Sequence, residues 1–174
     1  MKAVLISIRP KWCGLIASGK KTIEVRKTCP KLETPFKVYI YRTLPKSGDW
    51  NNRDGHVIGE FVCDSITEYA YGFSFNEEHA CISLKVNACL SGKDVFSYAG
   101  KGNVYGWHIS KLKIYDKPKK LTDFIKPCDP DPDGVPLCFQ CKRLVENYGC
   151  GGTIIRPPQS WMYVEELEGG NDNA

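Results

Sequence analysis

The fold is decided by residues 2–26, which read KAVLISIRPKWCGLIASGKKTIEVR. The opening stretch, 2–8, is rich in Leu and β-branched side chains, which predicts a strand. Pro10 suits the first turn of a helix, and we predict that helix over 10–18. Its apolar residues have the i, i+3, i+4 spacing of one buried face: Trp12, Leu15 and Ile16.

The turn after this helix leads directly into a strand of alternating character. Gly19 stands where a left-handed cap is expected, so the helix should end there. A strand over 22–27 follows, and its alternation gives one apolar face and one polar face. The apolar face carries Ile23 and Val25, and the polar face carries Thr22, Glu24 and Arg26.

Three charged side chains gather where the turn meets this strand. Lys21 leaves the turn beside Glu24 and Arg26. A carboxylate between two cations holds the guanidinium in a fixed fork, an arrangement that suits the binding of a base edge, a phosphate or a carboxyl group. The alternative is an ordinary salt-bridged strand face, because exposed ion pairs are common and contribute little stability.

Alternation and turn residues predict the remaining elements. We expect further strands over 36–43, 56–66, 103–115 and 160–167, and short helical pieces over 93–98 and 121–125. The Gly-, Asp- and Asn-rich stretch 45–55 predicts a surface loop, and the basic run 117–120 predicts a solvated turn. Weak periodicity over 67–102 indicates a variable crossover.

The composition describes a single folded domain with a mild positive charge. A chain of 174 residues with 42% hydrophobic content suffices for one core, and a net charge of +4 permits a nucleic-acid partner without requiring one. No apolar stretch has the length of a membrane span or a secretory signal, so we expect a cytoplasmic protein with no membrane partner. The absence of a P-loop or a dinucleotide glycine pattern predicts no nucleotide cofactor.

A Cys-rich segment interrupts the pattern before the last strand. Residues 127–152 are rich in Pro, Gly and Asp and have almost no apolar periodicity. Cys138 and Cys141 have the C-x-x-C spacing of a zinc knuckle, and Cys128 and Cys150 could complete a tetrahedral site. We predict a structural zinc that orders this insertion, with free thiols as the alternative.

A G-x-K-x-x-E-x-R pattern spans the turn and the strand: Gly19, Lys21, Glu24 and Arg26. It resembles the signature of the ASCH domain family, and the likeness extends over most of residues 1–125 and 155–167. The stretches 7–13 and 156–161 are similar to those of small ASCH proteins from bacterial and prophage genomes.

The resemblance implies a PUA-like fold. The fold class that we expect is α+β, a small PUA-like β barrel with short helices and a Cys-rich insertion before the last strand. The barrel would comprise residues 1–126 and 153–168, and the insertion would comprise residues 127–152. Residues 169–174 are too polar to fold alone and would form a disordered tail.

The resemblance also implies a cleft near the motif that binds RNA or a modified nucleoside. Glu24 would read a base edge, and the cations would hold phosphate. The expected ligand-binding residues are Arg9, Lys11, Lys21, Thr22, Glu24 and Arg26.

Alternatives to simple binding remain open. Some ASCH members are amidohydrolases on N4-acetylcytidine that use a Lys in this turn and a Thr on this strand. Here Lys21 matches, but Glu24 stands in place of the Thr, and a carboxylate cannot replace that nucleophile without new partners. Other members resemble ribonucleases, for which Lys21 and Glu24 could supply catalytic acid and base. A third alternative is an interaction protein that contacts a host protein through the Cys-rich insertion.

Aromatic residues and one histidine complete the candidates. A base could stack on Tyr39, Tyr41, Trp50, Tyr105 or Trp107. Their alternation with Val and Ile favours core packing for most of them. His108 points away from Trp107 and is the best placed of the three histidines for acid–base chemistry, although structural hydrogen bonding is the commoner role.

Overall fold

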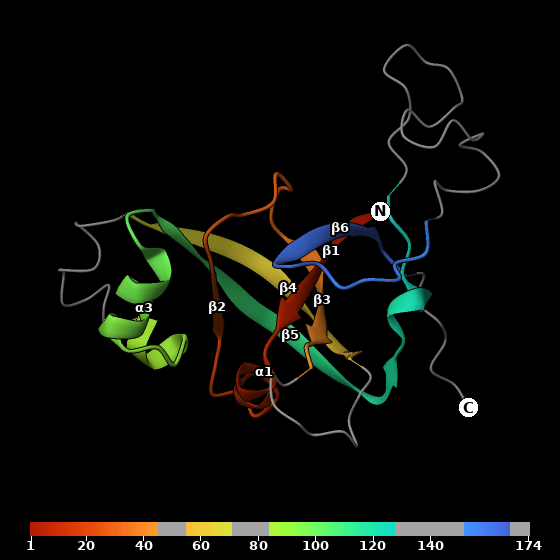
Figure 1. Ribbon diagram of the computed structural model, residues 1–174, viewed down its shortest axis with the longest axis horizontal. Helices are drawn as coiled ribbons and strands as arrows, with labels where there is room; N and C mark the ends of the chain where they lie inside the picture. The colour runs from red at the N-terminus through yellow and green to blue at the C-terminus, as the bar shows by residue number, and fades with distance from the viewer. Residues whose placement is uncertain (45–54, 71–83, 128–151, 168–174) are drawn as a thin grey trace, which may run out of the picture.

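The computed structural model describes residues 1–44, 55–70, 84–127 and 152–167, which form an α+β fold (Figure 1). The helices and strands are β1 (Lys2–Ile8), α1 (Pro10–Ala17), β2 (Ile23–Arg26), β3 (Phe36–Arg42), β4 (His56–Tyr69), α3 (Gly92–Ala99), β5 (Val104–Lys119), η1 (Leu121–Asp123) and β6 (Trp161–Glu165). The predicted insertion between 127 and 152 falls almost wholly outside the described residues, as does the predicted tail.

The strands form one six-stranded mixed sheet in the order β2-β5-β4-β3-β1-β6. Strands β1 and β3 run parallel, with Val4 opposite Val38, and the other neighbouring pairs are antiparallel. The first strand of the chain therefore lies between two strands that come from distant parts of the sequence. This arrangement brings β6, near the end of the described chain, next to the segment that leads into α1.

The sheet curls until its two ends approach each other. The indole Nε1 of Trp161, on β6, donates to the hydroxyl of Thr28 at 3.0 Å, just after β2. The backbone N–H of Lys31 donates to the hydroxyl of Tyr163 at 2.8 Å. These two hydrogen bonds link the ends of the sheet. Within the described residues the sheet is curled, and no backbone ladder between β2 and β6 closes it into the predicted barrel.

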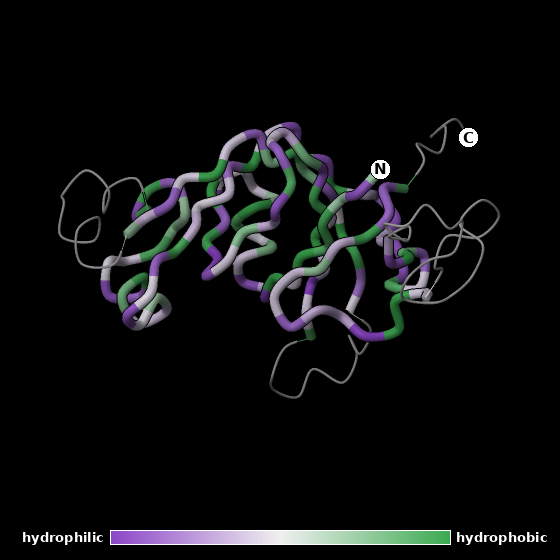
Figure 2. Tube along the Cα trace, turned by 90° about the horizontal axis from the view of Figure 1, so that it is seen from above, coloured by the Kyte–Doolittle hydropathy of each residue, from purple (hydrophilic) through white to green (hydrophobic). Residues whose placement is uncertain are grey.

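Apolar clusters cover both faces of the sheet. One includes Val4, Ile6, Val38 and Trp107 and packs against Cys13 and Ile16 of α1. The opposite face buries Ala3, Leu5, Tyr39, Phe124 and Ile154. A third cluster lies under α3 and includes Val25, Leu84, Val95 and Val104. Burial on both faces explains why the sequence of β1 is a nearly continuous apolar run. Figure 2 shows that hydrophobic and hydrophilic segments alternate along the described chain.

Most predicted elements are confirmed, and one is wrong. The basic run 117–120 was predicted as a turn, but β5 continues to Lys119, which pairs with Val57. A register shift between Val57 and Gly59 lets the strand resume beyond Pro118, whose ring nitrogen has no hydrogen to donate to a ladder. Among the described residues, every helix is too short or too polar to cross a lipid bilayer.

Candidate functional site

The motif turn is held by backbone contacts on both sides. Helix α1 begins with Pro10 and ends before Gly19, whose φ of +71° is the left-handed conformation that favours glycine. After the turn, the N–H of Lys21 donates to the carbonyl of Leu15 at 3.0 Å. The N–H of Thr22 donates to Asn87 at 2.8 Å, which ties the segment before α3 to the motif.

The three motif charges form one buried set. Glu24 Oε2 lies 3.4 Å from Lys21 Nζ, and Glu24 Oε1 lies 3.0 Å from Arg26 Nη2. The exposed fractions of these side chains are 3% for Lys21, 8% for Glu24 and 11% for Arg26. The prediction that the charges share one patch is confirmed. The alternative, a salt-bridged strand face, is right about the ion pairs but wrong about their exposure, because the set is buried.

Backbone carbonyls fix both cations. Lys21 Nζ donates to the carbonyl of Ala88 at 2.8 Å, and Arg26 Nη2 donates to the carbonyl of Ser7 at 2.6 Å. Arg26 Nη1 also lies 3.5 Å from the hydroxyl of Ser160. Arg26 Nε is buried and has no hydrogen-bond partner among the described atoms. The cations of the motif therefore connect β2 to three other segments: β1, the segment before α3 and the segment before β6.

Burial changes the acid–base behaviour of Lys21. Loss of contact with water lowers the pKa of its ammonium, and the nearby Glu24 carboxylate partly opposes this change. A buried lysine with a lowered pKa gives up its proton more readily than a surface lysine does. Lys21 is thus the group in this set that is best suited to acid–base chemistry.

The charged set forms the floor of a pocket of about 480 Å³. Its lining comprises Ser7, Ile8, Arg9, Trp12, Lys21, Glu24, Val25, Arg26, Thr43, Leu90, Asp94, Tyr98, Pro157, Pro158, Gln159 and Ser160. Two aromatic side chains belong to this lining, Trp12 from α1 and Tyr98 from α3. The segment 157–160 forms another part of the wall, and Ser7 ties it to β1 because its hydroxyl donates to the carbonyl of Pro158 at 2.6 Å.

The structure separates the six predicted ligand-binding residues into two groups. Four line the pocket: Arg9, Lys21, Glu24 and Arg26. Lys11 and Thr22 are not among the lining residues. The ammonium of Lys11 stands 4.7 Å from the ring centroid of Trp12, and the carbonyl of Thr22 accepts from the N–H of Ile109. The backbone of Thr22 therefore forms a hydrogen bond that joins the motif segment to β5.

Sequence reasoning missed the pocket residues contributed by α3 and by β1. Tyr98 and Asp94 fall in a stretch with weak periodicity, in which a helical piece is predicted over 93–98 but no pattern indicates that it contributes to a pocket. Ser7 is a polar residue within an apolar strand, a signal that could have found it. The segment 157–160 lies within the stretch that resembles ASCH proteins, but no local pattern indicates that it lines a pocket.

The other aromatic candidates are mostly core residues, as expected. Tyr39, Tyr41 and Trp107 are buried, and Trp50 lies outside the described residues. Tyr105 is half-buried, and its hydroxyl donates to Glu68 at 3.3 Å.

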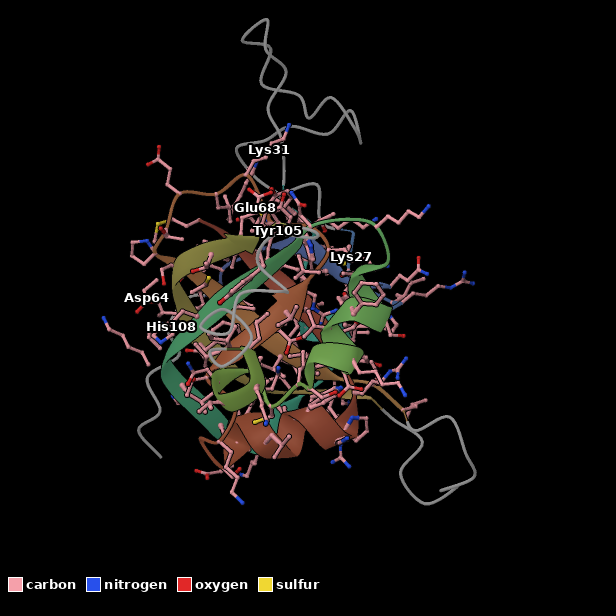
Figure 3. All side chains as sticks on the ribbon, turned by 90° about the vertical axis from the view of Figure 1, so that its left-hand side faces the viewer. Lys27, Lys31, Asp64, Glu68, Tyr105 and His108 are labelled. Carbon is pink, nitrogen blue, oxygen red and sulfur yellow. The ribbon has the colours of Figure 1, made fainter. Side chains whose placement is uncertain are left out.

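His108 forms a separate, exposed pair. Its Nδ1 lies 2.6 Å from Oδ1 of Asp64, and the two side chains are 46% and 42% exposed. This hydrogen bond is the main cause that lowers the pKa of Asp64. Neither residue lines the pocket, and in Figure 3 the two point toward each other on the side of the view away from Lys27.

The structure does not reach the predicted zinc ligands. Cys128, Cys138, Cys141 and Cys150 all lie outside the described residues. Within the described ranges, no three His, Cys, Asp or Glu side chains gather closely enough to hold a metal ion. The described cysteines, Cys13, Cys29, Cys63 and Cys89, are free thiols.

A comparison with protein-family models matches residues 6–120 to the ASCH domain. The chain belongs to the ASCH domain family. The match covers more than half of the chain and includes the G-x-K-x-x-E-x-R motif and Tyr98. The fold is PUA-like, and the ASCH family is associated with RNA binding.

Solved structures of an ASCH protein have the same fold. A crystal structure of ASCH from Zymomonas mobilis is 22% identical, with a TM-score of 0.59, and the alignment covers 94% of this chain and 88% of that one. A single-substitution variant of the Zymomonas mobilis protein is 21% identical, with a TM-score of 0.57 and coverage of 95% and 92%. A search of curated proteins found no match. None of these comparisons bears on the expected likeness to prophage-encoded members.

Proposed function

We propose that the pocket binds RNA or a modified nucleoside and that the edge of one base donates a hydrogen bond to Glu24. The observation that carries this proposal is the buried set of Lys21, Glu24 and Arg26 at the floor of a pocket with two aromatic residues in its wall. A volume of about 480 Å³ lies within the usual range of small-molecule sites. Fixed polar groups combined with aromatic faces are the means by which proteins recognise single unstacked bases.

Glu24 is the proposed acceptor for the base edge. Each of its oxygens already contacts one cation, but a carboxylate has about four acceptor positions, so further donors can be accommodated. Exocyclic amino groups of bases are such donors. Lys21 and Arg26 already donate to backbone carbonyls, so we assign phosphate binding to the exposed Arg9 at the pocket instead.

The proposal is tested by titrating a labelled single-stranded RNA of about ten nucleotides and following its fluorescence anisotropy. Arg9→Ala removes a cation that lines the pocket, and Lys119→Ala removes one that does not. We expect Arg9→Ala to weaken binding. In a plot of the logarithm of the binding constant against the logarithm of the salt concentration, its slope should be smaller in magnitude by about 0.7. The Lys119→Ala control should bind as the wild type does.

Free cytidine and N4-acetylcytidine, followed by calorimetry, form the second arm of this test. If the folded wild type binds neither the RNA nor the nucleosides at low salt, the proposed function is wrong. If Arg9→Ala and Lys119→Ala weaken RNA binding equally, the assignment of the ligand to this pocket is wrong.

Hydrolysis in the same pocket is a second candidate, favoured by the lowered pKa of Lys21. In that case Lys21 would act as the general base on RNA or on an acylated cytidine. Incubation of both substrates with the wild type should yield product, and Lys21→Met, which keeps the length of the side chain, should yield none. A folded wild type without turnover on either substrate would remove both activities.

A further inference from the structure

We infer that the ligand of this pocket is single-stranded nucleic acid rather than a free nucleoside, with a second base stacked on Tyr98 and a phosphate bound by Lys27. This inference rests on the proposed function and names the substrate class. It also assigns binding roles to two residues that the sequence pattern did not single out.

The first observation is an aromatic ring in the pocket lining with an exposed cation beside it. Tyr98 lines the pocket, and its side chain stays 38% exposed, so part of its ring remains open to a ligand. Lys27 is exposed, and its Nζ stands 5.2 Å from the centroid of the Tyr98 ring. Lys27 is not itself a lining residue, but it directly follows Arg26, which is, and it lies beside the lining residue Tyr98.

A second ring with its own cations belongs to the same lining. Trp12 comes from α1, and the ammonium groups of Lys11 and Lys21 stand 4.7 and 5.3 Å from its centroid. One nucleoside presents one base and no phosphate. Two aromatic rings from two helices, with the exposed Lys27 beside one and the exposed Lys11 beside the other, provide stacking and charge for consecutive nucleotides. The arrangement therefore favours a strand over a single nucleoside.

Helix α3 presents Tyr98 from a fixed position. It begins with the Ser91–Asp94 capping box, and Val95 and Ala99 are buried in the cluster beneath it. A tyrosine hydroxyl is neutral at physiological pH, and burial raises the pKa of the Tyr98 hydroxyl further, so the ring does not repel phosphate. A ring that is already held by packing loses little conformational entropy when a base stacks on it.

The structure supplies a matched control for each residue. Phe96 lies on the same helix and is 55% exposed, but it does not line the pocket. Lys119 stands 5.1 Å from the ring of Tyr115, which repeats the geometry of Lys27 and Tyr98 at the far end of β5. Tyr115 packs against the cluster on the opposite face of the sheet. Phe96→Ala thus removes a ring that does not line the pocket, and Lys119→Ala removes a cation whose partner ring does not line it.

The experiment measures the anisotropy of a labelled single strand of about ten nucleotides, prepared both as RNA and as DNA. Free cytidine and N4-acetylcytidine are titrated by calorimetry against the same proteins. The variants are Tyr98→Ala, Tyr98→Phe, Phe96→Ala, Lys27→Ala and Lys119→Ala. Thermal unfolding of each variant verifies that it is folded.

We expect Tyr98→Ala to weaken strand binding about tenfold or more, because base–aromatic stacking has that magnitude. Tyr98→Phe keeps the ring and should bind within about twofold of the wild type, and Phe96→Ala should bind as the wild type does. Lys27→Ala should make the salt dependence shallower by about 0.7 in the log–log slope, and Lys119→Ala should leave it unchanged. The DNA arm shows whether the backbone sugar contributes to recognition of the strand.

Two results would overturn the inference but leave the pocket proposal in place. One is a free nucleoside that binds as tightly as the strand, and the other is strand binding that Tyr98→Ala weakens no more than Phe96→Ala does. A wild type that binds neither strand nor nucleoside would instead overturn the proposed function itself. The two failures are therefore distinguishable in one set of titrations.

Discussion

Two side-chain contacts that involve β2 and its neighbour β5 differ in burial. On β2, Glu24 lies 3.0 Å from Arg26 in a nearly dry environment. On β5, His108 lies 2.6 Å from Asp64, with both side chains over 40% exposed. The residue before Glu24, Ile23, pairs directly with His108, so the two sites belong to adjacent parts of the same ladder.

The comparison teaches that distance alone does not rank ionic contacts. The exposed pair is shorter, but water and salt screen it, so its contribution to stability is small. The buried set loses its hydration, and the attraction between its opposite charges, together with the hydrogen bonds from its cations to backbone carbonyls, offsets that loss. A cluster that is costly to bury and that forms the floor of a pocket is the better candidate for function. The following predictions can break or sharpen this contrast.

The largest effect is expected for Glu24→Gln. This change leaves the buried Lys21 and Arg26 without their carboxylate, and removing one member of a buried ionic set costs about 3–5 kcal/mol. Chemical denaturation should show a loss of this size. Asp64→Asn is the matched change at the exposed pair, and an equal loss in both variants would contradict the contrast.

The next effect concerns Lys21 and pH. Because burial lowers its pKa from 10.5, the unfolded chain binds more protons than the native state between the lowered pKa and 10.5. Stability attributable to Lys21 therefore rises with pH across this window. The unfolding free energy of the wild type minus that of Lys21→Met should therefore increase as the pH rises. A difference that is independent of pH would show that Lys21 titrates as a surface lysine does.

A smaller effect is expected for Ser7→Ala at the pocket wall. The hydroxyl of Ser7 donates to the carbonyl of Pro158, and loss of such a hydrogen bond costs about 1 kcal/mol. RNA affinity should also decrease, because the segment 157–160 lines the pocket. Ser18→Ala removes an exposed hydrogen bond to Leu15 and serves as the control. Equal affinities in the two variants would mean that Ser7 does not position the wall.

The smallest effect is expected at the exposed pair. The pKa of Asp64 is lowered, so its contribution is present above the ordinary value of 3.8 and is lost as acid protonates the carboxylate. Asp64→Asn should therefore shift the unfolding midpoint at neutral pH by less than Ser7→Ala does. It should leave RNA affinity unchanged. A clear loss of RNA binding in this variant would move the site from the pocket to the pair of Asp64 on β4 and His108 on β5.

The sequence predicts the framework better than the pocket, for a physical reason. Periodicity and caps report local structure, so the β1–α1–β2 unit and the polar face of β2 were predictable. The pocket depends on contacts between distant segments, such as Arg26 with Ser7 and Ser160. Local patterns carry no signal for such contacts, which is why Tyr98 and the segment 157–160 were not assigned. The extension of β5 through Lys119 was missed because it depends on a register shift against β4.

The central claim, that nucleic acid binds in the motif pocket, is tested most directly by photo-cross-linking. A single-stranded RNA that contains a photoreactive pyrimidine would be irradiated with the full chain, and the linked peptides would be identified by mass spectrometry. The account predicts links to Trp12 and Tyr98, the two aromatic residues of the pocket lining. Links confined to peptides that contain Asp64 or His108 would contradict it.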